Sequence, residues 1–410
     1  MTELADALDI YLDDKRRGDA DAPGAFSTHG RSVLTRVQAY LAAEHGVTTV
    51  EAVDARTLRQ LARLWRDCAD PDREPRIEQD WWQTDLKAST VENYWAVLRA
   101  FLEWTVREGM RDDNPAKTRT AREPLPDASM DASRGAVERQ YWPADERERL
   151  RRYTRARVSS AYESPLAPPS VRRERVRNHL LVTLLCDTGA RIGELVSVSR
   201  DSRRNGVTWG DIELPEDESD EAAMWVLGKD QRRNDVPIPS QVRAALELFR
   251  RELVSQHGDV PDSWPLLPTR NRPTLSRYAR EQLGDDRVER LLDRGMDVEE
   301  LVITHDVEIP AISTNGARNL MQRLCDDASV DVDGDYLKPH GGRRAIGRDL
   351  FIDRPGVATE LLRHKSQQTT KESYGGVQRR SVREEVESLR GDSESSESDG
   401  LGVSLERLRE

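Results

Sequence analysis

The side chains that could carry out chemistry together in this chain are arginines, a lysine, histidines and a tyrosine between residues 191 and 374. Cleavage of a phosphodiester without a metal needs a nucleophile, cations for the five-coordinate phosphorus and an acid for the departing oxygen. Guanidinium groups bind phosphate oxygens through paired hydrogen bonds and stay protonated at any working pH. The candidates for these roles are Arg191, Lys229, His340, Arg343, His364 and Tyr374.

Local patterns place several of these candidates at the ends of expected elements. Arg191 follows residues 188–190, whose central glycine breaks one helix before a second, short one begins. His340 and Arg343 are three residues apart, which puts them on one face if the segment is helical. Lys229 falls between two short strand-like segments and is expected at a hairpin tip. Taken singly, each would be assigned a structural role, because packed or solvated side chains of these types far outnumber reactive ones.

Residues 140–390 are predicted to form a mixed α/β domain that carries these candidates. The segment 143–150, PADERERL, has a proline and acids in what reads as a first helical turn. Apolar residues between 176 and 185 predict a buried helix. Residues 255–320 are turn-rich with helical pieces such as 286–295, and we expect an insertion there. Three short β-branched segments predict a three-stranded antiparallel sheet: 206–214, 223–227 and 235–238.

Residues 1–116 are predicted to form a separate helical domain. Residues 89–92, Ser-Thr-Val-Glu, are typical of a capping box, and apolar residues then follow a period near 3.6 as far as Thr105. Asn114 and Pro115 end this long amphipathic helix, and 117–139 is expected to be an exposed linker. Three weaker stripes predict earlier helices: Leu4, Leu8 and Leu12; Val33, Val37, Tyr40 and Leu41; Leu58, Leu61, Leu64 and Trp65.

The overall charge is acidic, which by itself argues against a nucleic-acid partner. The chain carries 63 basic and 75 acidic residues, a formal net charge of −12. A basic channel can coexist with an acidic exterior, since net charge averages over the whole surface. Abundant carboxylates with scarce lysine are typical of proteins from halophilic organisms, where salt weakens phosphate contacts. The acidic, serine-rich residues 391–410 are expected to be disordered.

Composition also indicates the compartment and the absence of cofactors. No stretch approaches the roughly 20 apolar residues of a membrane span, and the first residues lack the pattern of a signal peptide. We therefore expect a cytoplasmic protein without a membrane partner. Cys68, Cys186 and Cys325 are far apart and in no metal-ligand spacing, so they are predicted to be lone buried thiols. No metal, nucleotide or other cofactor and no small-molecule substrate is expected.

Four segments contain the candidate residues: TGARIGEL at 188–195, with Arg191 and Glu194; GKDQRRNDVPIP at 228–239, with Lys229; HGGRR at 340–344; and LLRHKSQQTTKESY at 361–374. Together they resemble the tyrosine recombinases of the phage integrase family, including their Xer-like members. The resemblance covers the helical domain and most of the second domain, and its elements occur in the family's order.

The chain departs from the family pattern at a few positions. Tyr374 lies ten residues after His364, one more than the common family spacing. Arg363 replaces the usual glycine before the histidine, and Gly342 replaces the usual apolar residue of the His-x-x-Arg motif. Lys338 is a rival acid, but it matches nothing in the family pattern.

The resemblance implies a fold, a mechanism and partners. The fold would be mainly α with a small antiparallel β-sheet, in which a helical core-binding domain precedes a mixed α/β catalytic domain. Tyr374 would attack DNA to give a 3′-phosphotyrosyl link, Lys229 would protonate the leaving oxygen, and the two arginines and two histidines would hold the phosphate. The partners would be double-stranded DNA and further copies of the chain in a homotetramer.

Other interpretations remain open. A type IB topoisomerase-like enzyme uses similar chemistry, although the order of the motifs and the separate helical domain favour recombination. A decayed integrase would keep the DNA clamp but misplace Tyr374, and the altered spacing is the feature that supports it. A protein-interaction scaffold would leave the ordered motifs unexplained.

Overall fold

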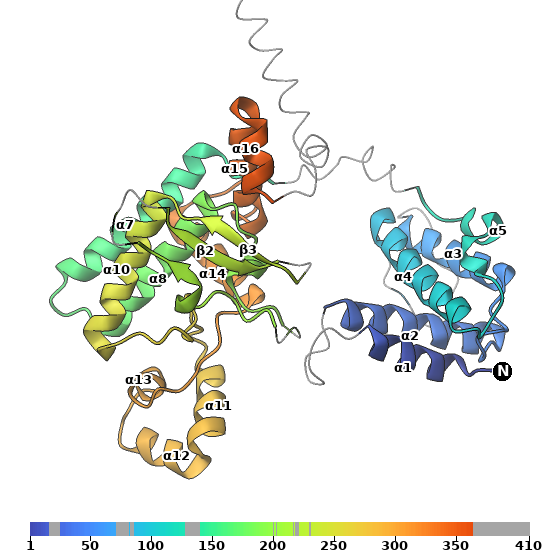
Figure 1. Cartoon of the computed structure of the whole chain (residues 1–410), viewed down its shortest axis with the longest axis horizontal. Coiled ribbons are helices and arrows are strands. Elements are labelled where there is room, and N and C mark those ends of the chain that lie inside the picture. Colours follow the sequence, from blue (N-terminus) through green and yellow to red (C-terminus); the bar gives the residue numbers. More distant parts are fainter. Residues whose placement is uncertain are drawn as a thin grey trace, which may run out of the picture. The chain divides into compact units, whose positions relative to one another are not determined.

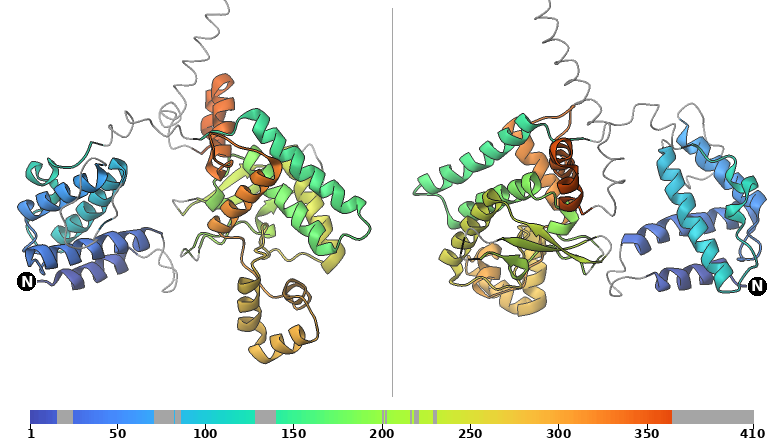
Figure 2. Two further views of the ribbon diagram at one scale, coloured as in Figure 1. Left: turned by 180° about the vertical axis from the view of Figure 1, so that it is seen from behind. Right: turned by 45° about the horizontal axis from the view of Figure 1, so that its top comes forward.

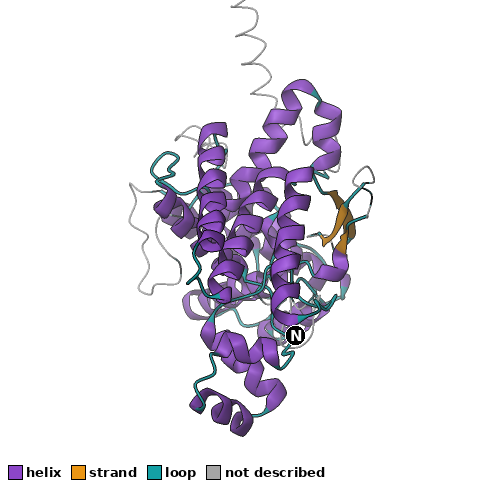
Figure 3. Ribbon diagram, turned by 90° about the vertical axis from the view of Figure 1, so that its left-hand side faces the viewer, coloured by secondary structure: helices purple, strands orange, loops and turns teal. Residues whose placement is uncertain are grey.

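The structure, a computed structural model, describes residues 1–15, 25–70, 82, 86–127, 140–199, 201, 203–215, 217, 221–228 and 231–363. Helices predominate over one small sheet (Figure 3), so the predicted fold class is confirmed. The chain divides into two compact units, Met1–Arg139 with Ser197–Asn205, and Gln140–Val196 with Gly206–Glu410. Three candidate residues and the acidic tail lie outside the described residues: Lys229, His364, Tyr374 and 391–410.

The first unit is a helical bundle around one aromatic-rich core. The apolar stripes of the sequence face this core, with Leu8, Leu41 and Leu61 all buried. Trp65, fully buried, meets the rings of neighbouring aromatic residues edge to face. The long amphipathic helix is confirmed, but it begins at Ala88 without a side-chain cap, so the predicted capping box is wrong. The helices are α1 (Leu4–Asp14), α2 (Ala25–His45), α3 (Ala55–Ala69) and α4 (Ala88–Arg107).

The chain after α4 stays attached to the first unit for longer than the sequence indicates. Residues Pro115–Lys117 form a 3-10 turn, η1, and Arg119–Arg122 form the short helix α5, both overlapping or adjoining the range predicted as linker. Ala116 and Ala121 are buried in the bundle core, and the indole nitrogen of Trp95 donates to the carbonyl of Ala116 at 3.3 Å. Small apolar side chains therefore hold this polar segment on the bundle.

Helix α8 is the central support of the second unit. Every side chain from Val176 to Cys186 is buried, and helices α7, α10 and α15 pack around α8 (Figure 1). This helix is the buried one that the sequence predicts, and the proline-acid segment before it opens α7 as expected. The helices of this part are α7 (Ala144–Glu163), α8 (Pro169–Asp187), α9 (Ile192–Leu195), α10 (Ser240–His257), α14 (Thr314–Ala328), α15 (Pro339–Asp353) and α16 (Pro355–Leu361).

The predicted three-stranded antiparallel sheet is present, in the order β1-β2-β3. Its strands are β1 (Ile212–Glu213), preceded by the 3-10 turn η2 (Trp209–Asp211), β2 (Ala223–Leu227) and β3 (Arg233–Pro237). Met224 and Val226 alternate with more exposed neighbours and enter the core, as the two-residue period of a strand requires. The first strand is shorter than predicted, because the chain before it turns through η2.

Helices α11 (Arg272–Leu283), α12 (Asp285–Asp293) and α13 (Val298–Thr304) form a small group within the expected insertion. They surround a core of their own, which includes Leu275, Val288 and Leu301. Both views in Figure 2 place this group at the end of the second unit opposite to α15 and α16.

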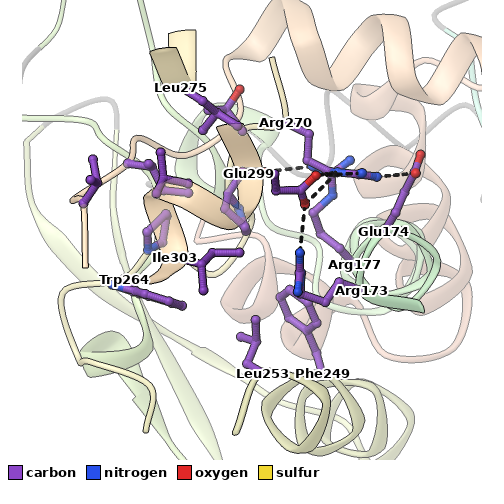
Figure 4. A pocket seen from close by; sticks show the side chains of 16 residues that line it. Arg173, Glu174, Arg177, Phe249, Leu253, Trp264, Arg270, Leu275, Glu299 and Ile303 are labelled. Carbon is purple, nitrogen blue, oxygen red and sulfur yellow. Dashed lines mark hydrogen bonds and ion pairs between the residues drawn. The ribbon is translucent and has the colours of Figure 1, made fainter. Parts of the chain in front are cut away.

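Arginines of α8 connect this group to the rest of the unit. The Glu299 carboxylate accepts from Arg270 at 2.9 Å and from Arg173 of α8 at 3.4 Å (Figure 4). Arg177 donates to the carbonyl of Pro268 at 2.8 Å beside a cavity of about 40 Å³, and burial lowers its pKa to about 10. Partly buried ion pairs and the buried Arg177 therefore connect the α11–α13 group to α8.

We expect the second unit to lose stability as the pH falls from about 6.5 toward 4. Burial, and then the charges of Arg155 and Arg151, lower the pKa of His179 to about 4, and its ring nitrogen lies 2.9 Å from the Thr154 hydroxyl. The unfolded chain, with a histidine pKa near 6.5, binds the proton first and is favoured in this window. Between pH 7 and pH 5, urea unfolding should show His179→Asn losing on the order of 2 kcal/mol less than wild type. Equal losses would contradict the burial of a neutral histidine.

We also expect Glu299→Ala to release α11–α13 from α8. Arg173 and Arg270 would be left partly buried without their shared carboxylate, which destabilises the native arrangement. Limited trypsin digestion within 272–304 should become on the order of 10- to 100-fold faster. Glu300→Ala, which removes the exposed neighbouring carboxylate, is the matched control and should digest like wild type.

Candidate active site

Arg191 and Glu194 form one end of the candidate site, directly after α8. Arg191 caps the short helix α9, and its backbone N–H donates to Oε2 of Glu194 at 2.8 Å. Its Nη1 donates to Oε1 of the same carboxylate at 2.8 Å. The Glu194 side chain is fully buried, whereas the Arg191 side chain is 37% exposed. The exposed N–H groups of Arg191 can therefore donate to an anion in the solvent, while Glu194 holds the backbone N–H and Nη1 of Arg191 in place.

A tight turn at residues 188–190 separates the end of α8 from Arg191. The Thr188 hydroxyl donates to the Leu184 carbonyl at 2.7 Å and accepts from the backbone N–H of Ala190 at 3.2 Å. Gly189 has φ +61°, a left-handed conformation that suits glycine. The turn that the sequence predicts here is confirmed.

Arg343 connects this turn to the end of α16. It lies on α15 and is 3% exposed. Its Nη1 donates to the carbonyl of Gly189 at 2.5 Å, and its Nη2 donates to the carbonyl of Leu362. A single guanidinium thus joins α15 to the turn at 188–190 and to the residue after α16, and it places a buried positive charge against the turn that precedes Arg191.

Two glycines let α15 pack closely, Gly342 against α8 and Gly341 against Trp142. A Cβ on Gly341 would lie 2.5 Å from Cδ1 of Trp142, and a Cβ on Gly342 would overlap the carbonyl oxygen of Leu185. Trp142 is itself fixed, because its indole nitrogen donates to the Lys338 carbonyl at 2.8 Å. The departure from the family pattern at Gly342 is therefore explained by packing.

His340 and Lys338 lie near the start of α15. The segment is helical, and His340 is exposed while Arg343 is buried. The ammonium group of Lys338 pairs with the Asp335 carboxylate. Because Lys338 already has an acidic partner, the structure gives no support to it as a rival proton donor.

The structure places the Arg343 guanidinium against the turn that precedes Arg191. Lys229, His364 and Tyr374 lie outside the described residues. The backbone on both sides of Lys229 is described: β2 ends at Leu227, β3 begins at Arg233, and the Gly228 N–H donates to the Arg232 carbonyl at 2.8 Å. In the described part of the chain, no cluster of histidine, cysteine and carboxylate side chains could hold a metal ion. No described helix is long and apolar enough to span a membrane.

Arg363 belongs to the site although the sequence gives it no role. Its Nη2 donates to Oε2 of Glu194 at 2.6 Å, so one buried carboxylate serves two arginines. Burial lowers the pKa of Arg363, Glu194 opposes this shift, and the positive charge of Arg191 adds to it. Its replacement of a family glycine was the only signal in the sequence.

Comparison with known proteins identifies the fold. No family model and no curated protein matches the chain. Among solved structures, the XerH site-specific recombinase bound to palindromic difH substrate, a post-cleavage complex, is 13% identical with a TM-score of 0.53 over 89% of this chain and 80% of that chain. The Tn1549 transposon integrase in complex with transposon right end DNA is 15% identical with a TM-score of 0.52 over 95% and 100%. The same integrase in complex with a circular intermediate DNA is 13% identical with a TM-score of 0.50 over 94% and 100%. The chain has the fold of the tyrosine recombinases.

We expect Gly342→Ala to destabilise the site by separating α15 from α8. The added methyl group would overlap the carbonyl of Leu185, and overpacking of this kind costs about 1–3 kcal/mol. Urea unfolding followed by tryptophan fluorescence measures the change. Gly356→Ala, whose methyl group would meet no atom within 4 Å, is the control and should unfold like wild type. Equal stability of the two variants would show that α15 does not need this close approach.

Proposed function

We propose that this chain is a site-specific DNA recombinase that cleaves and rejoins DNA strands through a tyrosine. The arginine cluster at the end of α8, in a chain folded like DNA-bound recombinases, supports this proposal most strongly. We assign residues 1–116 to a helical core-binding domain and 140–390 to the catalytic domain. The 117–139 segment between them would contact the DNA backbone through its arginines.

In the proposed reaction, the phenol oxygen of Tyr374 forms a bond to the scissile phosphorus. The bond from phosphorus to the 5′ oxygen breaks, and that oxygen takes a proton from Lys229. His340 and His364 orient the phosphate or relay protons, including the one that leaves the phenol. The covalent 3′-phosphotyrosyl link conserves the phosphodiester energy, so the reverse step needs only a 5′ hydroxyl from a partner duplex. No nucleotide cofactor enters this scheme.

Arg191 and Arg343 would stabilise the charge that develops on the phosphate. Arg191 is partly exposed and pre-positioned by Glu194, so its guanidinium can bind phosphate oxygens without a large rearrangement. Arg343 is buried against the turn at 188–190, and its charge would act on the phosphate through surroundings of low dielectric. Exchange between two duplexes would take place in a homotetramer of this chain on DNA.

A covalent-trapping assay tests this function. Wild-type protein and nicked suicide duplexes, which carry the ends of the genetic element that encodes the chain, should give a labelled protein–DNA adduct in low or high salt. Tyr374→Phe should abolish the adduct because it removes the nucleophilic oxygen. Arg191→Ala should slow adduct formation roughly 10²- to 10³-fold, the usual effect of losing a donor to a developing charge.

Tyr336→Phe is the matched control for the nucleophile. Tyr336 lies before α15 and packs against the core, so this variant should form the adduct at the wild-type rate. Tight binding of the same duplexes without any adduct would favour the decayed integrase instead. An adduct that survives Tyr374→Phe would place the nucleophile on another residue.

A further inference from the structure

The Glu194 carboxylate is divided between two arginines in an unequal way. Oε2 accepts both the backbone N–H of Arg191 at 2.8 Å and Nη2 of Arg363 at 2.6 Å. Oε1 accepts Nη1 of Arg191 at 2.8 Å. A carboxylate oxygen has two lone pairs, so both sites on Oε2 are taken. The Arg191 side chain is therefore limited to Oε1.

Without Arg363, the same carboxylate would draw Arg191 inward. An arginine beside a buried carboxylate favours a bidentate pair, in which two of its N–H groups bind both oxygens. Such a pair would use a second donor of Arg191 and neutralise its charge. With Arg363 present, two positive charges share one negative charge, and Arg191 keeps an uncompensated part of its charge.

The local structure of Arg363 is unfavourable apart from its contact with Glu194. Its φ is +49°, a left-handed conformation in which glycine would be unstrained. Its Nη1 is buried and finds no hydrogen-bond partner in the described structure, and an unmade hydrogen bond is unfavourable. The carbonyl of the preceding residue, Leu362, accepts from Arg343, so residues 362–363 contact Arg343 directly and Glu194 through the Arg363 side chain.

We propose that Arg363 is a positioning residue for strand cleavage, which occupies Oε2 of Glu194 and thereby keeps the outer edge of the Arg191 guanidinium available to a DNA phosphate. This inference rests on the proposed function. It assigns Arg363 no contact with the DNA, and its effect passes through Glu194 to Arg191.

The test measures the single-turnover rate of adduct formation on the nicked suicide duplexes, at saturating protein. Arg363→Gly removes the whole side chain with its guanidinium and suits the left-handed backbone, so the chain should fold. Its rate should fall roughly 10- to 100-fold, the usual effect of a misplaced catalytic group, with less than about a threefold change in the Kd for the duplex. Arg363→Lys, which restores a charge within reach of Glu194, should recover most of the rate. Arg354→Gly removes an exposed arginine before α16 and should leave the rate unchanged.

A double-mutant cycle separates positioning from a structural role. In the Glu194→Gln background the neutral amide no longer neutralises Arg191, so adding Arg363→Gly should change the rate by less than about twofold. A wild-type rate in Arg363→Gly, or an equal loss in both backgrounds, would overturn the inference and leave the proposed function standing. If wild type itself gives no adduct, the proposed function fails and this inference falls with it.

Discussion

The hydrogen bonds of the buried Arg343 guanidinium hold the segments of the candidate site together. Its Nη1 and Nη2 donate to backbone carbonyls, one in the turn after α8 and one at the end of α16. Backbone carbonyls cannot move without moving the chain, so these bonds fix the segments rather than single side chains. Gly342 serves the same constraint, because it allows the helix that carries Arg343 to reach α8.

Helix α8 connects the candidate site to the α11–α13 group of the second unit. It has 19 residues, which corresponds to about 28 Å at 1.5 Å per residue. Arginines in its first half hold the α11–α13 group through Glu299 and Pro268. The turn at 188–190, which leads to Arg191, follows its last residue. Because the α11–α13 group and the candidate site both adjoin this one buried helix, a change in the packing of α8 would displace both of them.

The local charge of the site differs from that of the chain. The protein has a net charge of −12, yet in the site two guanidinium groups share one buried carboxylate, and a third, that of Arg343, binds the adjoining backbone. Buried pairs are screened less by salt than exposed ones, so a cluster of this kind keeps its attraction for an anion where surface charges lose theirs. An acidic exterior and an anion-binding site are therefore compatible in one molecule.

The sequence by itself determined the main helices and strands and the turn at 188–190 that precedes Arg191. Apolar periodicity and a glycine break are local signals, so the buried helix α8, the turn before Arg191 and the three strands could all be predicted. Only the tertiary structure decided what lies next to what. The sharing of Glu194 with Arg363, the carbonyl partners of Arg343 and the need for Gly342 each join segments more than 15 residues apart. Spacing along the chain carries no information about such distances, because they are set by how the helices pack.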